Sequence, residues 1–309
     1  MITSLFRKST PLNYAIVLLA IVFFFFLYQI QHVTSANSTW HMAMKWSLLG
    51  IIFASLFIVN FIVKKNGLSK DSTYTVLFYM IFMLFFPTVL DNIPLILSNF
   101  CILLSMRRVV SLHSLKAPKE KIFDAALWVF VASLFHFWSI LFIILVFISI
   151  LFHAARDYRN WFLPFIAFFT IAIIFVLSAI LFNKAWIGNL WNGSLIDLRI
   201  NYFTSNYQNL ALSLYATIGL FFIVSLLLSL SNRPLILHSS YKKIISAFLI
   251  GILVFVLSPG KSNDLAVFTF APLAMMATSH IEMAAVKWQK EVILFSALLC
   301  GFFAFFSQL

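Results

Sequence analysis

Long apolar stretches alternate with short polar segments along the whole chain. An apolar stretch of about 20 residues can cross a bilayer as an α-helix, because a helix rises about 1.5 Å per residue and the hydrocarbon core is about 30 Å thick. The pattern therefore predicts an all-α, polytopic transmembrane helical bundle. Eleven spans are expected, at residues 13–30, 47–63, 73–90, 93–106, 122–135, 137–152, 161–182, 209–230, 244–258, 265–280 and 292–308.

The longest apolar stretch, residues 123–153, has basic residues on both sides, with Lys121 before it and Arg156 after it. As one helix it would extend about 45 Å, well beyond the hydrocarbon core. Basic residues at both ends favour a cytoplasmic location for both ends, which a single crossing does not allow. We therefore expect a helical hairpin with His136 at its outer apex.

The lysines and arginines predict the orientation of the bundle. With a cytoplasmic N-terminus, every inner segment is basic, as is typical of membrane proteins. This orientation leaves only four of the 21 basic residues outside: Lys45, Lys184, Arg199 and Lys261. The first apolar run follows Arg7 and Lys8 and continues without a prompt small-residue cleavage site, so we expect a retained first span and not a cleaved signal peptide.

Three of the predicted spans, at 93–106, 122–135 and 265–280, are short for a bilayer. Fourteen helical residues rise only about 21 Å, and basic residues hold the cytoplasmic end of each span. The missing length should fall on the outer side, where a polar backbone must be buried in protein or line a wet cavity. The sequence thus predicts helices broken on the outer side around a recess, unless the bilayer thins there. The expected wall residues are Asp91, His136, Lys261 and Asp264.

The longest predicted outer segment, residues 183–208, interleaves aromatic and polar side chains. Its tryptophans and tyrosines are typical of anchors at the membrane–water interface. Alternatively, the segment forms a short amphipathic helix over the recess. In that interpretation Trp191, Asp197 and Arg199 would bind a glycan or a lipid headgroup.

Composition narrows the classes of function. The chain is 63% hydrophobic and 10% charged, whereas about a quarter of a soluble domain is charged, so we expect one integral membrane domain over residues 1–309. The net charge of +12 is explained by basic cytoplasmic loops, and no nucleic-acid partner is expected. Cys101 and Cys300 lie in apolar runs, which favours neither a disulfide nor a zinc site. The dispersed histidines lack paired ligand spacing, so we expect no metal site and assign no cofactor.

Candidate chemistry rests on single residues, because the chain carries none of the specific catalytic motifs. His136 could be a general base for a hydroxyl acceptor. Alternatively, it is an apex histidine packed against Phe135, Phe137 and Trp138. Asp91 could be a catalytic carboxylate, or Asp91 or Asn92 could cap the helix that begins near Pro94. Two further candidates follow the Pro–Gly turn at residues 259–260. Lys261 could bind a phosphate or simply be solvated, and Asp264 could be a site residue or the cap of the helix that begins there.

Several blocks of the chain carry a resemblance. SLFRKSTPLNY, SNFCILLSMRR, KIFDAALWVFVASLFHFWSILF and SPGKSNDLAVFTFAPLAMMATSHIE resemble a family of uncharacterised bacterial multi-pass inner-membrane proteins. More distantly, ASLFHFWSILF and FTFAPLAMM are similar to GT-C-type glycosyltransferases and polysaccharide polymerases. That second likeness implies a polyprenyl-phosphate-linked sugar and an outward-facing cavity. The first outer loop, residues 31–46, has no carboxylate where GT-C enzymes carry their catalytic acid.

These observations favour a membrane-embedded transferase of cell-envelope glycan assembly in the bacterial inner membrane. Asp91 or His136 would accept the acceptor proton, and Lys261 or Arg199 would stabilise the leaving phosphate. The expected partners are membrane lipids and a polyprenyl-phosphate-linked sugar. The alternatives are a lipid or glycan transporter, a non-enzymatic subunit or scaffold of an envelope machine, and a histidine–metal oxidoreductase.

Overall fold

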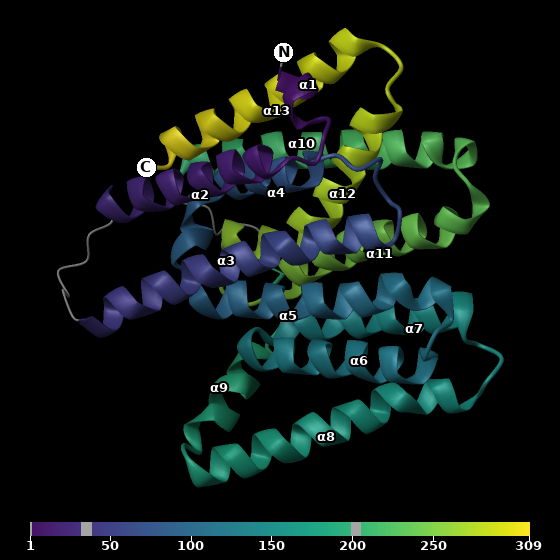
Figure 1. Cartoon of the computed structure of the whole chain (residues 1–309). Helices are drawn as coiled ribbons and strands as arrows, with labels where there is room; N and C mark the ends of the chain where they lie inside the picture. The colour runs from purple at the N-terminus through teal and green to yellow at the C-terminus, as the bar shows by residue number, and fades with distance from the viewer. Residues whose placement is uncertain (1, 32–38, 199–204) are drawn as a thin grey trace. The chain divides into compact units, whose positions relative to one another are not determined.

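A computed structural model of the chain describes residues 2–31, 39–198 and 205–309, and these residues form helices and turns with no strand among them (Figure 1). The all-α prediction is confirmed for this part of the chain. The α-helices are α1 (Ile2–Phe6), α2 (Pro11–Gln31), α3 (Thr39–Lys65), α4 (Tyr74–Leu84), α5 (Ile93–Val110), α6 (Pro118–Phe135), α7 (Ile143–His153), α8 (Arg159–Leu181), α9 (Ala185–Gly193), α10 (Asn206–Ser229), α11 (Leu235–Leu257), α12 (Val267–Met283) and α13 (Lys287–Ser307). Short 3-10 helices are η1 (Pro87–Asp91), η2 (Ser111–Ser114), η3 (Phe137–Phe142), η4 (Leu230–Asn232) and η5 (Asn263–Ala266).

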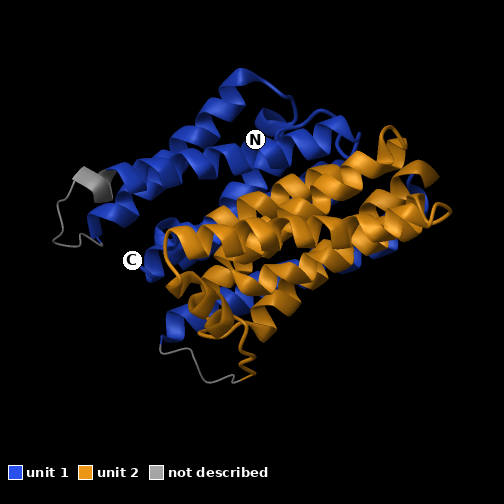
Figure 2. Cartoon of the chain, turned by 90° about the horizontal axis from the view of Figure 1, so that it is seen from below, with its two compact units in different colours: residues 1–96, 203–233, 270–309 blue, residues 97–202, 234–269 orange. Residues whose placement is uncertain are grey.

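The helices form two compact units, coloured separately in Figure 2. Unit 1 comprises residues 1–96, 203–233 and 270–309, and unit 2 comprises residues 97–202 and 234–269. The chain therefore passes from one unit to the other four times. The expectation of one integral membrane domain stays a prediction.

In unit 1, helix α4 is buried on all sides. Every residue from Tyr74 to Leu84 is buried, and α2, α3 and α13 contact the helix. A helix that is apolar all round needs this environment, because it has no polar face to turn toward water. Aromatic rings extend the core beyond the end of α4: Phe82, Phe85 and Phe86 each contact Tyr215 of α10 with ring centroids 5.2–5.7 Å apart.

In unit 2, the predicted break at His136 is confirmed, while the location of this break on the outer side of a membrane stays a prediction. Helix α6 ends at Phe135, His136 has an extended backbone (φ −142°, ψ 108°), and the chain returns through η3 and α7, which contact α6. The carbonyl of His136 accepts hydrogen bonds from the Ser139 backbone N–H at 3.1 Å and the Ser139 hydroxyl at 2.8 Å. These bonds hold the sharp change of direction. Helix α8 packs along α6, and α9 follows α8 and contacts η3 (Figure 1).

Each of the eleven predicted spans contains a helix, but fewer than eleven of the described helices are long and apolar enough to cross a membrane. In the part of the chain that the structure describes, eight helices are long and apolar enough to cross a membrane, and residues 74–84 and 137–153 form shorter apolar helices. Helix α6 is not among the eight, because its first two turns carry four charged residues: Lys119, Glu120, Lys121 and Asp124. Several helices of the chain thus have the length and apolar character of membrane spans, while eleven spans and a cytoplasmic N-terminus stay predictions.

Two of the predicted short spans, at residues 93–106 and 122–135, lie within longer helices. Helices α5 and α6 each have 18 residues, because both continue through their basic ends, with Arg107 and Arg108 inside α5 and Lys121 inside α6. Each helix rises about 27 Å, which nearly matches the hydrocarbon core. Among the helices that lie in predicted spans, the shortest are α4 and α7, with 11 residues each, and both adjoin 3-10 helices. The backbone is nevertheless irregular at η1, η3 and η5, which lie where the sequence predicted broken helices.

Candidate functional site

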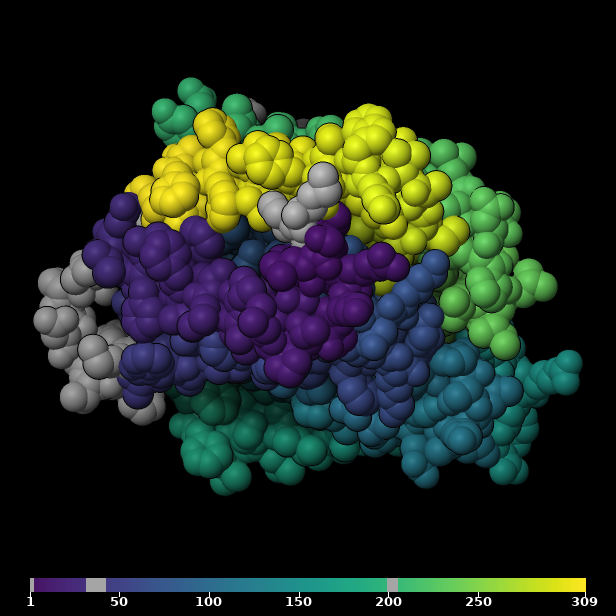
Figure 3. Space-filling model, turned by 45° about the horizontal axis from the view of Figure 1, so that its top comes forward, coloured from purple at the N-terminus to yellow at the C-terminus, as the bar shows by residue number. Residues whose placement is uncertain are grey.

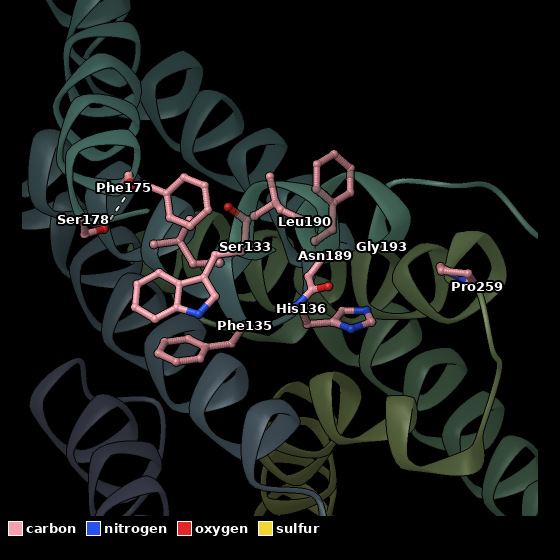
Figure 4. Close-up of a pocket in the computed structure, with 12 residues that line it drawn as sticks. Ser133, Phe135, His136, Phe175, Ser178, Asn189, Leu190, Gly193 and Pro259 are labelled. Atoms are coloured by element: carbon pink, nitrogen blue, oxygen red, sulfur yellow. Dashed lines mark hydrogen bonds between the residues drawn. The ribbon is translucent and has the colours of Figure 1, made fainter. Parts of the chain in front are cut away.

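A cavity of about 550 Å³ lies in unit 2 where the chain breaks between α6 and η3. Its wall comes from the end of α6, the start of η3, one turn of α8, the inner face of α9 and the turn after α11 (Figure 4). The lining residues are Ser133, Leu134, Phe135, His136, Phe137, Phe175, Ser178, Trp186, Asn189, Leu190, Gly193 and Pro259. A volume of this size is within the usual range for small-molecule pockets.

The break in α6 turns two neighbouring side chains apart. In Figure 4 the rings of Phe135 and His136 point in opposite directions, as expected for an extended residue that follows a helix. The imidazole of His136 lies against the ring of Phe268, with centroids 5.7 Å apart, and Phe268 in turn contacts Phe142 of η3. The histidine is therefore both the apex residue packed among rings and a wall residue of the cavity.

A hydrogen bond to Ser258 orients the His136 ring. The Nε2 atom of His136 lies 2.9 Å from Ser258 Oγ, and the Ser258 hydroxyl donates to the Val254 carbonyl at 2.6 Å. A hydroxyl has one hydrogen, so Nε2–H of His136 is the donor to Ser258. The ring's other nitrogen, Nδ1, is then its hydrogen-bond acceptor. Burial lowers the pKa of His136 to about 4, so the imidazole is neutral near pH 7 and a weak base.

Three hydrogen bonds hold the segment that follows α9. Trp138 Nε1 donates to the Leu195 carbonyl at 3.3 Å, and the Asp197 backbone N–H donates to the Leu257 carbonyl at 3.4 Å. The Lys261 ammonium donates to the carbonyl of Asp197. These contacts tie the exit of α9 to η3 and to the end of α11, and so they fix α9 beside the cavity. Lys261 thereby has a structural partner in the backbone of a predicted site residue.

Helix α9 forms where the sequence predicted a short amphipathic helix. Its cavity face consists of Trp186, Asn189, Leu190 and Gly193, at the i, i+3, i+4, i+7 spacing of one helical face. Trp191 is on another face of α9: its side chain is 72% exposed and does not line the cavity. The helix therefore offers Trp186 to the cavity in place of the predicted Trp191.

The other predicted site residues are dispersed. Asp264 is 8% exposed within η5 of unit 2, Asp197 contributes its backbone as described, and Arg199 lies outside the described residues. Asp91 ends η1 in unit 1, so it belongs to a different unit from His136. Neither Asp91 nor Asp264 lines the cavity.

The capping question at the start of α5 is settled by a side-chain contact. The Asn92 Oδ1 atom accepts a hydrogen bond from the Leu95 backbone N–H at 3.3 Å, and Pro94 occupies the second helical position. Both features are typical of a helix N-terminus. Asn92 is the cap, and Asp91 is an exposed carboxylate.

Sequence reasoning did not single out Asn189 or Ser258. The helical spacing of Asn189 from Trp186 could have identified the cavity face of α9, because both residues recur on one side of a 3.6-residue turn. Ser258 gave no such signal, since its pairing with His136 spans 122 residues of sequence.

The described side chains that line the cavity provide no permanently charged group. Its lining combines aromatic rings and aliphatic side chains with an imidazole, an amide and hydroxyls, and no lysine, arginine or carboxylate is among the described residues that line it. Across the described ranges, no three His, Cys, Asp or Glu side chains gather as metal ligands. Such a lining suits an uncharged polar group attached to an apolar body.

Comparison with known proteins assigns the chain to a family. No curated protein and no solved structure matches it. A family model matches residues 5–309, which is nearly the entire sequence. The chain therefore belongs to the family of unknown function DUF6427.

Proposed function

We propose that this chain is a bacterial inner-membrane protein of cell-envelope glycan assembly, and that the cavity beside α9 binds the sugar of a polyprenyl-phosphate-linked donor. The observation that carries the proposal is the lining of the cavity, in which aromatic rings adjoin neutral hydrogen-bonding groups. The apolar face of a sugar ring can stack on the aromatic rings of the cavity, and the sugar hydroxyls can form hydrogen bonds with its neutral polar groups.

The contacts available to a sugar can be named. The ring of Trp186 offers a stacking surface, and the Asn189 amide both donates and accepts hydrogen bonds. Nδ1 of His136 can accept a hydrogen bond from a sugar hydroxyl, given the tautomer set by Ser258.

The apolar part of the ligand has a path along α8. Phe175 lines the cavity, and the neighbouring residues Ile173, Ile174, Val176 and Leu177 of α8 are exposed. An exposed apolar helix in a membrane protein faces lipid, where an isoprenoid chain is soluble. A lipid-linked sugar could therefore enter from the side, with its chain in the bilayer and its sugar in the cavity.

Transfer of the bound sugar to an acceptor hydroxyl is also part of the proposal. It would require a base for the acceptor hydroxyl, and His136 is a weak one because its pKa is lowered to about 4. Asp91 remains the predicted carboxylate, and it lies in unit 1. The neutral lining thus supports sugar binding more directly than catalysis, and it also suits the alternative of a carrier that moves the lipid-linked sugar.

Two tryptophans of α9 give a matched test. The full-length protein, in phosphatidylcholine nanodiscs, would be titrated with a short-chain polyprenyl-phosphate-linked hexose, and binding would be measured by native mass spectrometry. We expect Trp186→Ala to weaken binding about tenfold, because a stacking ring is lost. Trp191→Ala, on the same helix but outside the cavity, should bind as the wild type does. Equal affinities for all three proteins would contradict the proposal.

Catalysis is tested separately. If the protein is a transferase, Asp91→Asn and His136→Ala should abolish turnover of the bound donor while leaving expression and folding normal. A binding-competent protein with no turnover in the wild type would favour the carrier.

A further inference from the structure

Unit 1 contains a second and larger cavity, of about 930 Å³, with strongly polar walls. It is enclosed by α1, the residues that join α1 to α2, the residues before α4, the end of α12 and the start of α13. Figure 3 shows the N-terminal segment in purple lying against the yellow C-terminal helices on this face. No residue of this cavity belongs to unit 2, so it is separate from the sugar site proposed above.

The acidic residues of this cavity are all engaged by groups of the protein. Asp71 forms an ion pair with Lys64 at 3.0 Å. Glu282 accepts hydrogen bonds from the Ser72 hydroxyl at 2.6 Å and from the Lys70 backbone N–H at 2.9 Å. Glu291 accepts from the backbone N–H and the hydroxyl of Thr3. These bonds draw the N-terminal segment, the turn before α4 and the start of α13 around the cavity.

In the described part of the chain, the basic side chains of this cavity form no ion pair, although the backbone N–H of Lys70 donates to Glu282. Arg7, Lys8, Lys70, Lys287 and Lys290 line the cavity, and among the described residues none of the five forms an ion pair. Five cations that converge on one hollow repel one another, and the repulsion is relieved by a bound anion. The carboxylates do not relieve it fully, because they are three against five and are held by other donors.

From this arrangement we propose that the unit 1 cavity binds a phosphate-bearing anionic group. A phosphate oxygen accepts hydrogen bonds from ammonium and guanidinium groups, and a phosphomonoester carries up to two negative charges. The walls also provide neutral hydroxyl donors, those of Ser4, Ser9 and Thr10. The phosphate could belong to a membrane lipid or to a soluble metabolite, because both present the same chemistry to the cavity.

The charges of the cavity do not distinguish a lipid phosphate from a soluble one, but apolar side chains lie beside its lining residues. Leu5, Val286 and Trp288 are 47%, 42% and 65% exposed beside the lining residues Ser4, Ala285 and Lys287. An aromatic and two aliphatic side chains next to cations are typical of the membrane–water interface. The experiment must therefore compare one headgroup with and without its acyl chains.

The test uses the full-length protein in phosphatidylcholine nanodiscs. Dioctanoyl phosphatidic acid and glycerol 3-phosphate carry the same phosphate headgroup, and each would be titrated with calorimetric detection of binding. We expect saturable binding of at least one probe. Binding of phosphatidic acid alone would assign the site to a lipid, and similar binding of both would assign it to a soluble phosphate.

A charge-matched pair of variants separates a site from general attraction to a basic protein. Lys287→Gln/Lys290→Gln removes two charges from the cavity, and we expect affinity to fall on the order of tenfold or more. Lys116→Gln/Lys242→Gln removes two exposed charges from unit 2 and should change affinity less than about twofold, a change that follows net charge alone.

Arg7→Gln/Lys70→Gln removes two other charges of the cavity lining and should repeat the loss, which guards against a folding defect in one variant. Thermal unfolding without ligand would show that each variant is folded. The proposal is overturned if neither probe binds saturably, or if the cavity and control variants weaken binding equally.

Discussion

The ammonium of Lys243 lies 2.8 Å from the carbonyl oxygen of Val109, so a buried lysine of α11 closes the C-terminal end of α5. Lys243 is 1% exposed, and its Nζ also lies 3.4 Å from the Val110 carbonyl. The last carbonyls of a helix have no partner within the helix and carry its partial negative charge. The Lys243 side chain supplies a hydrogen-bond donor at this position, and Ser149 adds a hydroxyl donor to Val109 at 3.2 Å.

Removing this contact should destabilise the protein. Lys243→Met keeps the length and apolar stem of the side chain but removes the lysine donor, so the Val109 carbonyl keeps only the Ser149 hydroxyl and the Val110 carbonyl keeps only the His113 ring. We expect a loss of roughly 1–3 kcal/mol, visible as a lower midpoint of thermal unfolding in detergent. The matched control is Lys242→Met, because Lys242 is the exposed neighbour on α11. A Lys243→Met protein as stable as the control would show that the carbonyls find other donors.

The pH dependence of stability should contain a contribution from His136. Its pKa is lowered to about 4 in the folded protein, from an ordinary value of 6.5, because burial disfavours the charged form. Between these values the unfolded chain binds more protons than the folded one. The stabilisation is therefore complete above about pH 6.5, is lost progressively as the pH falls toward 4, and changes no further below that.

His136→Gln removes this contribution. The midpoint of thermal unfolding, measured from pH 7.5 to 4 in one detergent, should fall less steeply for His136→Gln than for the wild type. Parallel profiles for the variant and the wild type would mean that His136 does not titrate with folding.

The membrane orientation can be tested with single cysteines. In a Cys101→Ala/Cys300→Ala background, Lys184→Cys should react with a membrane-impermeant maleimide applied from the periplasmic side. Lys116→Cys should react only after the membrane is permeabilised, since positive loops stay cytoplasmic. Lys184 directly precedes α9, so its labelling also reports the side on which the cavity of unit 2 opens. The reverse pattern would invert the predicted topology.

The sequence by itself determined the helices of this protein, because apolar runs bounded by charged or polar residues form helices in almost any environment that buries them. The break at His136 followed from the same reasoning: residues 123–153 are too long for one span and are flanked by basic residues. The short helix α9 followed from its amphipathic composition. These features are local, and each depends on fewer than about 40 neighbouring residues.

Only the tertiary structure decided which faces of the helices meet protein. Helix α4 is buried on all sides, while most of α8 is exposed, yet both sequences are almost uniformly apolar. A helix without a polar face carries no periodic signal for its orientation. In α9 the sequence proposed Trp191 as a ligand contact, whereas the structure places Trp186 in the cavity lining.

The polar contacts at the two cavities and at the end of α5 also required the fold, because they join residues far apart in the chain. His136 meets Ser258, Lys243 meets Val109, and Thr3 meets Glu291 across 288 residues. In an apolar interior each polar group must find a partner, and the packing of the helices decides which partner is within hydrogen-bond distance. The helices are thus a property of the sequence, and the two cavities are a property of how those helices pack.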